Sequence, residues 1–249
     1  MLTLLHTSPV HVPVFDALRD REHPGLAMRH VVDEALLDRA RSGGPGAADS
    51  AIAAVLDAAV GEGGATAVLC TCSTIGAADS AIAAVLDAAV GEGGATAVLC
   101  TCSTIGAVAE ANAARLGVPV LRVDRPMAAA AVAAAPERDV VRIAVVATVE
   151  STFGPTCDVI REEADAAGRT AVIRTVPAEG AWKYFEDGDR ESYLDLVART
   201  VDTITGVDVV VLAQASMADA AARTRTGTAA PVLSSPAPGL RAAAAAAVR

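Results

Sequence analysis

Aromatic side chains are scarce in this chain, and basic side chains are outnumbered by acidic ones. Only 2% of the 249 residues are Phe, Trp or Tyr, while 53% are hydrophobic. The core must therefore be built from Ala, Val, Leu and Ile. The formal net charge is −10 and the pI is about 4.8. Since no basic stripe offsets this charge, we expect no binding to nucleic acid or to anionic membranes.

Long apolar runs and an N-terminal targeting pattern are also lacking. No run of 18 residues is free of polar breaks, so we predict no membrane span. The start, MLTLLHTSPV, has no charged region before its apolar residues and is typical of a strand rather than a signal peptide. Five cysteines in such a chain indicate a reducing, cytoplasmic location rather than a disulfide framework.

One segment of the sequence is present twice. Residues 46–77 recur without a change at 76–107, an offset of 30 residues. Two identical copies, 46–75 and 76–105, indicate a recent tandem duplication rather than a solenoid. We expect one copy to fold in place and the other to form a long connection. The alternative is an added helix–strand unit that widens a parallel sheet.

The duplication also bears on the cysteines. Each copy contributes a Cys-Thr-Cys motif, which superficially suggests a zinc site. Because the second motif is only a copy of the first, we predict no structural metal.

Strand and helix patterns alternate along the chain. Runs such as VDVVVLA are apolar throughout, which is typical of parallel strands buried on both faces. Predicted strands are Leu2–His6, Ala27–Val32, Ala67–Cys70, Ala97–Cys100, Val118–Val123, Arg142–Ala147, Ala171–Val176, Asp208–Ala213 and Pro231–Ser234. Predicted helices cover 13–21, 106–116, 125–135, 154–167, 189–204, 217–225 and 236–247, with one more in each repeat copy. This alternation predicts an α/β fold with parallel sheet. The stretch at 136–139 suggests a division into subdomains 1–136 and 137–249.

Small polar residues follow several of the predicted strands. Ligands of open α/β sheets bind at the carboxyl ends of strands, and helix N-termini there suit a carboxylate or phosphate. Ser and Thr are also ordinary helix N-caps, so a single cluster carries little weight. The candidate substrate-binding residues are Thr7, Ser8, Ser73, Thr74, Ser103, Thr104, Thr148, Ser151, Thr152, Ala215 and Ser216.

Three of these strand ends resemble motifs of the aspartate/glutamate racemase superfamily, which includes hydantoin racemases, maleate isomerases and arylmalonate decarboxylase. AVLCTCST resembles a strand that ends in Cys-Asn-Thr, AVVATVEST one that ends in Ala-Thr-x-x-Thr, and VVVLAQASM one that ends in Leu-Gly-Cys. The resemblance implies two similar α/β subdomains related by a pseudo-twofold axis, with the active site in the cleft between them.

The resemblance also implies the chemistry. In this superfamily, one cysteine thiolate removes a proton from the carbon next to a carboxylate, and a second cysteine protonates the opposite face, without a cofactor. The first cysteine corresponds to Cys72 or its copy Cys102. A helix N-terminus would lower its thiol pKa. Cys70, Cys100 and Cys157 are expected to be buried core residues.

The position of the second cysteine is occupied by Gln214, which cannot act as an acid or base. The first prediction is a cofactor-independent racemase or isomerase that acts on a small-molecule carboxylate. The alternatives are a decarboxylase that uses one cysteine, a maleate-isomerase-like enzyme whose thiolate adds to its substrate, and a carboxylate-binding protein without catalysis. Gln214 could instead form hydrogen bonds to an oxyanion or to a substrate carboxylate. The sequence does not decide whether the protein forms a homo-oligomer.

Overall fold

Two compact units make up the part of the chain that this computed structural model describes. The described residues are 2–6, 9, 12–26, 28–32, 67–70, 87, 97–101, 110–111, 113–225 and 230–247. The first unit comprises Met1–Val123 with Gly239–Arg249, and the second comprises Asp124–Pro238. The subdomain boundary after residue 136 stays a prediction.

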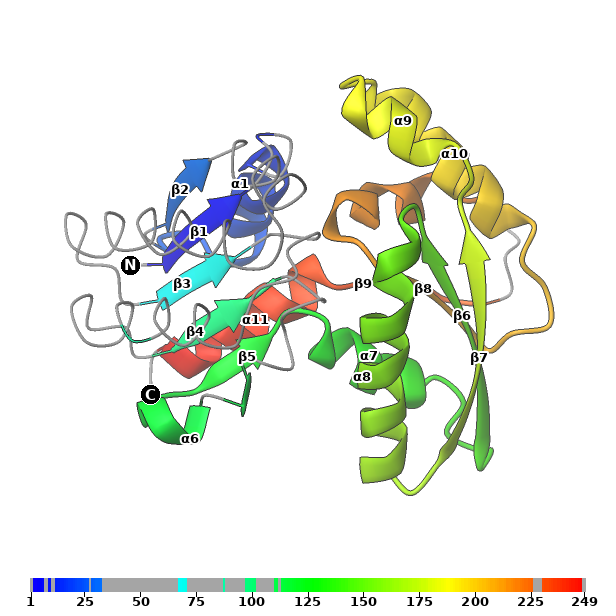
Figure 1. The fold of residues 1–249 in the computed structure, drawn as a ribbon, viewed down its shortest axis with the longest axis horizontal. Helices are drawn as coiled ribbons and strands as arrows, with labels where there is room; N and C mark the ends of the chain where they lie inside the picture. The colour runs from blue at the N-terminus through cyan, green and yellow to red at the C-terminus, as the bar shows by residue number, and fades with distance from the viewer. Residues whose placement is uncertain are drawn as a thin grey trace. The chain divides into compact units, whose positions relative to one another are not determined.

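The first unit is built on a five-stranded sheet in the order β2-β1-β3-β4-β5, with all neighbours parallel (Figure 1). Its strands are β1 (Leu2–His6), β2 (Met28–Val32), β3 (Ala67–Cys70), β4 (Val98–Cys100) and β5 (Val120–Arg122). Its helices include α1 (Val12–Glu22), α6 (Ala113–Leu116) and most of α11 (Pro236–Ala247). Phe15 and Leu18 on α1, with Leu99 on β4, are among its buried residues.

Both copies of the repeat contribute a strand to this sheet. Strands β3 and β4 are parallel neighbours, paired Leu69 with Leu99 and Cys70 with Cys100, so each residue lies beside its own copy. The expectation that one copy forms only a connection is therefore wrong. The reason is that the identical apolar segments suit a buried parallel strand equally well. The 30-residue spacing also leaves enough chain for a parallel crossover.

The second unit has a four-stranded parallel sheet in the order β7-β6-β8-β9. Its strands are β6 (Val140–Ala147), β7 (Thr170–Pro177), β8 (Val209–Leu212) and β9 (Val232–Ser234). Its helices are α7 (Arg125–Val132), η2 (Glu150–Thr152), α8 (Phe153–Ala166), α9 (Ala181–Glu186), α10 (Arg190–Asp202) and η3 (Ala215–Arg223). The prediction of an α/β fold with parallel sheet is confirmed.

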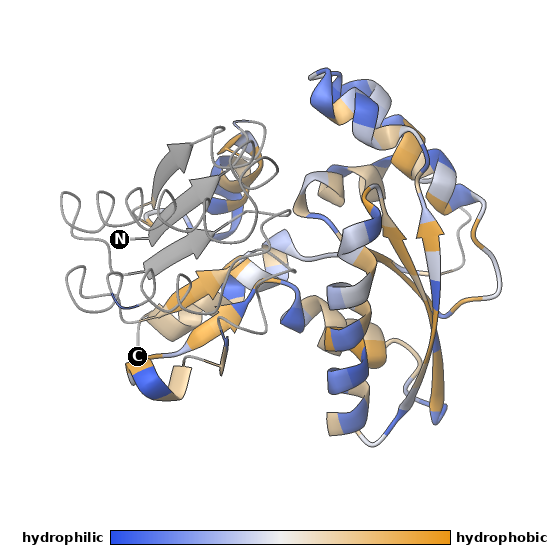
Figure 2. Cartoon of the chain, in the orientation of Figure 1, coloured by the Kyte–Doolittle hydropathy of each residue, from blue (hydrophilic) through white to orange (hydrophobic). Residues whose placement is uncertain are grey.

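Two separate hydrophobic clusters cover the two faces of this second sheet. Ile143 and Val145 of β6 pack with α7 and α8, whereas Ala144 and Val146 pack with α10 and η3. Figure 2 shows the central strands as almost uniformly hydrophobic, while the helices carry hydrophilic outer faces. Successive strand residues point to opposite faces, so a strand buried on both sides must be apolar throughout.

Two local elements differ from the sequence-based expectation. The predicted helix at 217–225 is the 3₁₀-helix η3, which begins earlier, at Ala215. The aromatic stretch that holds Trp182 and Phe185 forms the short helix α9, where the two rings stack with centroids 4.7 Å apart. None of the described helices is long and apolar enough to cross a membrane.

Candidate active site

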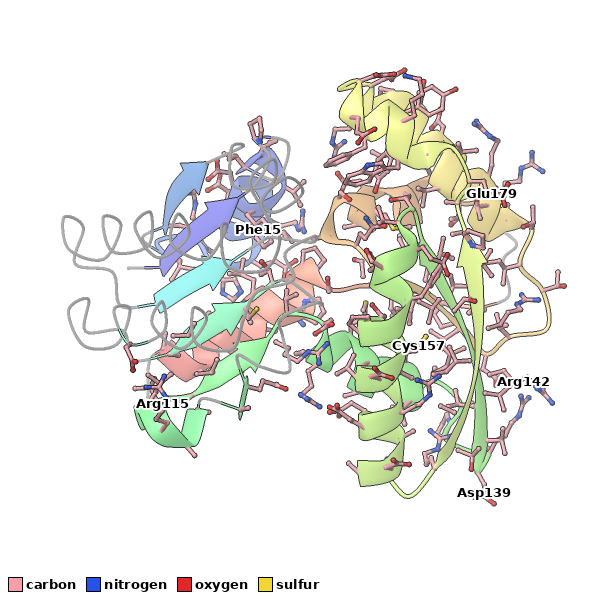
Figure 3. The ribbon with its side chains drawn as sticks, viewed as in Figure 1. Phe15, Arg115, Asp139, Arg142, Cys157 and Glu179 are labelled. Atoms are coloured by element: carbon pink, nitrogen blue, oxygen red, sulfur yellow. The ribbon has the colours of Figure 1, made fainter. Side chains whose placement is uncertain are left out.

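The carboxyl edge of the second sheet gathers the polar residues predicted to lie after its strands. Figure 3 labels Glu179 beyond the end of β7 at this edge, and Asp139 and Arg142 toward the amino edge. Thr148 follows β6 directly, and Gln214 lies two residues beyond the end of β8. Since β6 and β8 are parallel neighbours, the two residues leave the sheet side by side.

Thr148 binds the side chain of Gln214 through two hydrogen bonds. The Thr148 backbone N–H and the Thr148 hydroxyl both donate to Gln214 Oε1, each at 2.7 Å. Gln214 is 5% exposed. A backbone N–H can only donate, so this contact fixes which end of the carboxamide is the oxygen.

The orientation of Gln214 determines what it offers to a ligand. With Oε1 turned toward Thr148, the amide nitrogen Nε2 carries two N–H donors away from that contact. Within the described part of the chain, both hydrogen bonds of the Gln214 side chain are made by Oε1, and none by this nitrogen. Gln214 thus presents its N–H donors on the side away from Thr148.

A tyrosine and a serine extend this arrangement. The Tyr193 hydroxyl lies 2.7 Å from Ser216 Oγ, two residues after Gln214. Burial raises the pKa of Tyr193 to about 12, although the nearby hydroxyls of Ser216 and Thr148 oppose the shift. Tyr193 is therefore a neutral phenol at physiological pH. We refer to Thr148, Tyr193, Gln214 and Ser216 as the strand-end cluster.

The short helix η2 carries the other predicted polar residues of this half. Ser151 is exposed, whereas Thr152 is 1% exposed and immediately precedes the 14-residue helix α8. The Thr152 hydroxyl is buried and has no hydrogen-bond partner among the described residues. A buried hydroxyl without a partner is costly, so its presence beside a helix N-terminus is compatible with a ligand contact.

Two polar residues at this edge were not predicted as site residues. Ser235 is 2% exposed and separates β9 from α11. Like the predicted site residues, Ser235 is a small polar residue between a strand and a helix, so the same pattern identifies it. Tyr193 lies on α10, and nothing in the nearby sequence indicates that its hydroxyl reaches Ser216, beyond the end of β8.

The predicted residues of the first unit lie outside the described residues. These are Thr7, Ser8, Cys72, Ser73, Thr74, Cys102, Ser103 and Thr104. The strands that precede them, β1, β3 and β4, are parallel neighbours that end at one edge of their sheet. Their roles stay predictions.

Two of the three cysteines expected to belong to the core are buried. Cys100 and Cys157 are both buried, at 3% and 5% exposure. Figure 3 shows Cys157 on α8, and burial raises the pKa of its thiol, which makes it a poor source of thiolate at neutral pH. The described residues contain no group of three His, Cys, Asp or Glu side chains placed to hold a metal ion.

Solved structures share this fold at low sequence identity. A glutamate racemase from Francisella tularensis subsp. tularensis SCHU S4, in complex with D-glutamate, is 11% identical with a TM-score of 0.56, covering 98% of this chain and 79% of that chain. Glutamate racemase isoform RacE1 from Bacillus anthracis is 12% identical with a TM-score of 0.54, covering 98% and 80%. An arylmalonate decarboxylase is 14% identical with a TM-score of 0.51, covering 99% and 92%.

Sequence comparison identifies the family directly. The family described as Asp/Glu/Hydantoin racemase matches residues 71–243. The chain belongs to the Asp/Glu/hydantoin racemase family, as its strand-end motifs suggested. No curated protein matches the sequence.

Proposed function

We propose that this chain is a cofactor-independent enzyme that transfers a proton at a carbon next to a carboxylate. A cysteine thiolate, from Cys102 or its copy Cys72, is the base. The observation that carries the proposal is the orientation of Gln214, whose amide oxygen is held by Thr148 at 2.7 Å. Proton removal beside a carboxylate builds negative charge on the carboxylate oxygens, and fixed N–H donors stabilise such charge.

Gln214 also bears on whether protons are transferred on one face of the substrate or on both. A racemase or isomerase that works from both faces needs a second acid, and a carboxamide cannot titrate. In the strand-end cluster, the only titratable side chain is Tyr193, which is 1% exposed and has a pKa raised to about 12. Gln214 therefore favours proton transfer on one face, as in a one-cysteine decarboxylase, over racemisation by two bases.

A carboxylate substrate fits the groups at the edge of the second sheet. Gln214 supplies N–H donors, the Thr152 hydroxyl is free of partners among the described residues, and helix α8 begins immediately after Thr152. Helix N-termini favour anions through unpaired N–H groups and the positive end of the helix dipole. The complex of the Francisella tularensis racemase with D-glutamate supports a carboxylate as the substrate class.

The test is exchange of the α-proton in heavy water, followed by NMR over a panel of amino acids, hydantoins and substituted malonates. We expect exchange, or decarboxylation with deuterium incorporation, that is abolished in the double variant Cys72→Ser/Cys102→Ser. The two single variants identify the copy that supplies the base, because only one of them should lose turnover. Full activity in the double variant would show that the thiolate mechanism is wrong.

A further inference from the structure

The pairing of strands β3 and β4 places equivalent cysteines of the two repeat copies side by side. Cys70 on β3 is the register partner of Cys100 on β4, just as Leu69 is the partner of Leu99. Figure 1 shows β3 and β4 as adjacent strands of the first sheet. A chain with one copy of the repeat would have one cysteine at this position, so the pair exists only because the segment is present twice.

The spacing of the two strands suits a disulfide bond between these residues. Neighbouring strands of a sheet lie about 4.8 Å apart, and register partners lie on the same face of the sheet. Cysteines joined by a disulfide have their Cα atoms about 4.4–6.8 Å apart. The backbone separation expected between Cys70 and Cys100 falls within this range.

The residue on the other side of Cys100 favours its reaction with an oxidant. Arg122 on β5 is the register partner of Cys100, so Cys70, Cys100 and Arg122 form one row across three strands. Cys100 and Arg122 are 3% and 2% exposed. A guanidinium is always charged, and a cationic neighbour favours the thiolate, which is the form of cysteine that attacks an oxidant. We therefore expect Cys100 to be the first of the pair to react.

We propose that Cys70 and Cys100 are a modification site, at which a peroxide joins the two repeat copies through a disulfide bond. The Cys100 thiolate attacks one oxygen of hydrogen peroxide, the O–O bond breaks, and a sulfenic acid and hydroxide form. The hydroxide takes up the proton that the thiol had released. The Cys70 thiol then attacks the sulfenic sulfur, so that the S–S bond forms and water leaves. Two thiols are thereby oxidised, and one peroxide is reduced to two molecules of water.

Cleavage after glutamate separates the two copies and distinguishes a bond between them from a bond within one of them. Glu62, Glu92 and Glu110 bound two fragments of different length, 63–92 and 93–110, each with one Cys-Thr-Cys motif. The wild-type protein is oxidised at low concentration with hydrogen peroxide, blocked with N-ethylmaleimide in denaturant, digested and weighed by mass spectrometry. We expect the two fragments to be joined in one species that reduction separates. Unjoined fragments, or a bond within either motif, would overturn the proposal.

Cysteine variants identify the two residues of the bond. The double variant Cys72→Ser/Cys102→Ser keeps Cys70, Cys100 and Cys157. After oxidation, this variant should take up one N-ethylmaleimide instead of three, and its mass before blocking should fall by two hydrogen atoms. Cys157 is the matched control, because it is also buried, at 5% exposure, but lies on α8 in the second unit. Its further replacement by serine should leave the bond intact.

Two results with the variants would contradict the assignment. Uptake of three N-ethylmaleimide molecules by the oxidised double variant would show that Cys70 and Cys100 do not join. Loss of the bond on replacement of Cys157 would show that the disulfide has another partner. If the double variant does not fold, the glutamate digest of the wild-type protein decides the proposal, because it needs no substitution.

Discussion

Two buried threonines near the start of α8 share the same unfavourable feature. Thr152 and Thr156 are 1% and 0% exposed, and neither hydroxyl has a hydrogen-bond partner among the described residues. Only Thr152 belongs to a strand-end motif, between β6 and α8. If the Thr152 hydroxyl binds a ligand and the Thr156 hydroxyl only fills space in the core, replacement of each threonine by valine should affect ligand binding differently.

We predict that Thr156→Val stabilises the protein by about 1 kcal/mol, because valine keeps the shape of threonine and removes an unpaired buried hydroxyl. Its kcat/KM should be unchanged. Thr152→Val should stabilise to a similar extent but weaken carboxylate binding about 10- to 100-fold, since a hydrogen bond to a charged group is lost. Thermal unfolding and ligand titration measure the two effects. Equal binding by both variants would contradict a ligand role for Thr152.

At the residue scale, the sequence predicted three members of the strand-end cluster but not Tyr193. Thr148, Gln214 and Ser216 were identifiable because each follows a strand that the sequence marks clearly. Tyr193 was not, because it is distant in sequence from Ser216 and reaches it only when α10 packs on the sheet. Ser235 follows the same local rule as Thr148 and could have been included.

At the scale of single elements, α11 depends on a close approach to the end of β5. A Cβ atom placed on Gly239 would lie 2.5 Å from Val123 Cγ2 and 2.7 Å from the Val123 carbonyl oxygen. Real side chains essentially never come so close, and the backbone of Val123 cannot simply turn aside. The glycine therefore permits the packing of α11, although glycine weakens a helix in isolation.

We predict that Gly239→Ala destabilises the protein by about 1–3 kcal/mol, because overpacking outweighs the better helix propensity of alanine. Gly154 on α8 is the matched control, since nothing lies within 4 Å of a Cβ placed there. Gly154→Ala should instead stabilise by about 0.5–1 kcal/mol. Thermal unfolding of the two variants should thus give shifts of opposite sign. A gain in stability from Gly239→Ala would contradict the packing of α11 on Val123.

Elements of the second unit followed the sequence closely where the hydrophobic pattern was strong. Strands β6 to β9 lie where the sequence predicted them, and the central strands β6 and β8 are apolar because they are buried on both faces. Helix α9 was missed since six residues are too few to show a period. No local pattern in the sequence distinguishes the 3₁₀-helix η3 from an α-helix.

At the scale of the whole molecule, the two sheets have the same strand order when one copy of the repeated strand is left out. The first sheet runs β2-β1-β3-β4-β5 and the second β7-β6-β8-β9. Omission of either β3 or β4 leaves four strands in the first sheet with the same connectivity as in the second. We therefore interpret the duplicated strand as an insertion into a four-stranded sheet. The pseudo-twofold relation between the two halves stays a prediction.

We predict that deletion of one copy leaves a folded protein. Because the copies are identical, removal of 46–75 or of 76–105 gives the same chain of 219 residues. The shortened chain should retain cooperative unfolding and the proton-exchange activity of the parent. It keeps one copy of the cysteine that is present as both Cys72 and Cys102. Circular dichroism and the exchange assay provide the measurement. A deleted chain that fails to fold would show that the fifth strand is an integral part of the sheet.

The most direct test of a one-thiol site with Gln214 as hydrogen-bond donor is the stereochemical course of α-deuterium incorporation. A single enantiomer of each exchanging substrate is incubated with the wild-type protein in heavy water, and configuration is followed together with deuterium content. We predict that deuterium enters with retention of configuration, because the proposed base is a single thiol and Gln214 cannot serve as a second acid. Inversion at the rate of exchange would contradict this, since it requires a second acid that Gln214 cannot provide.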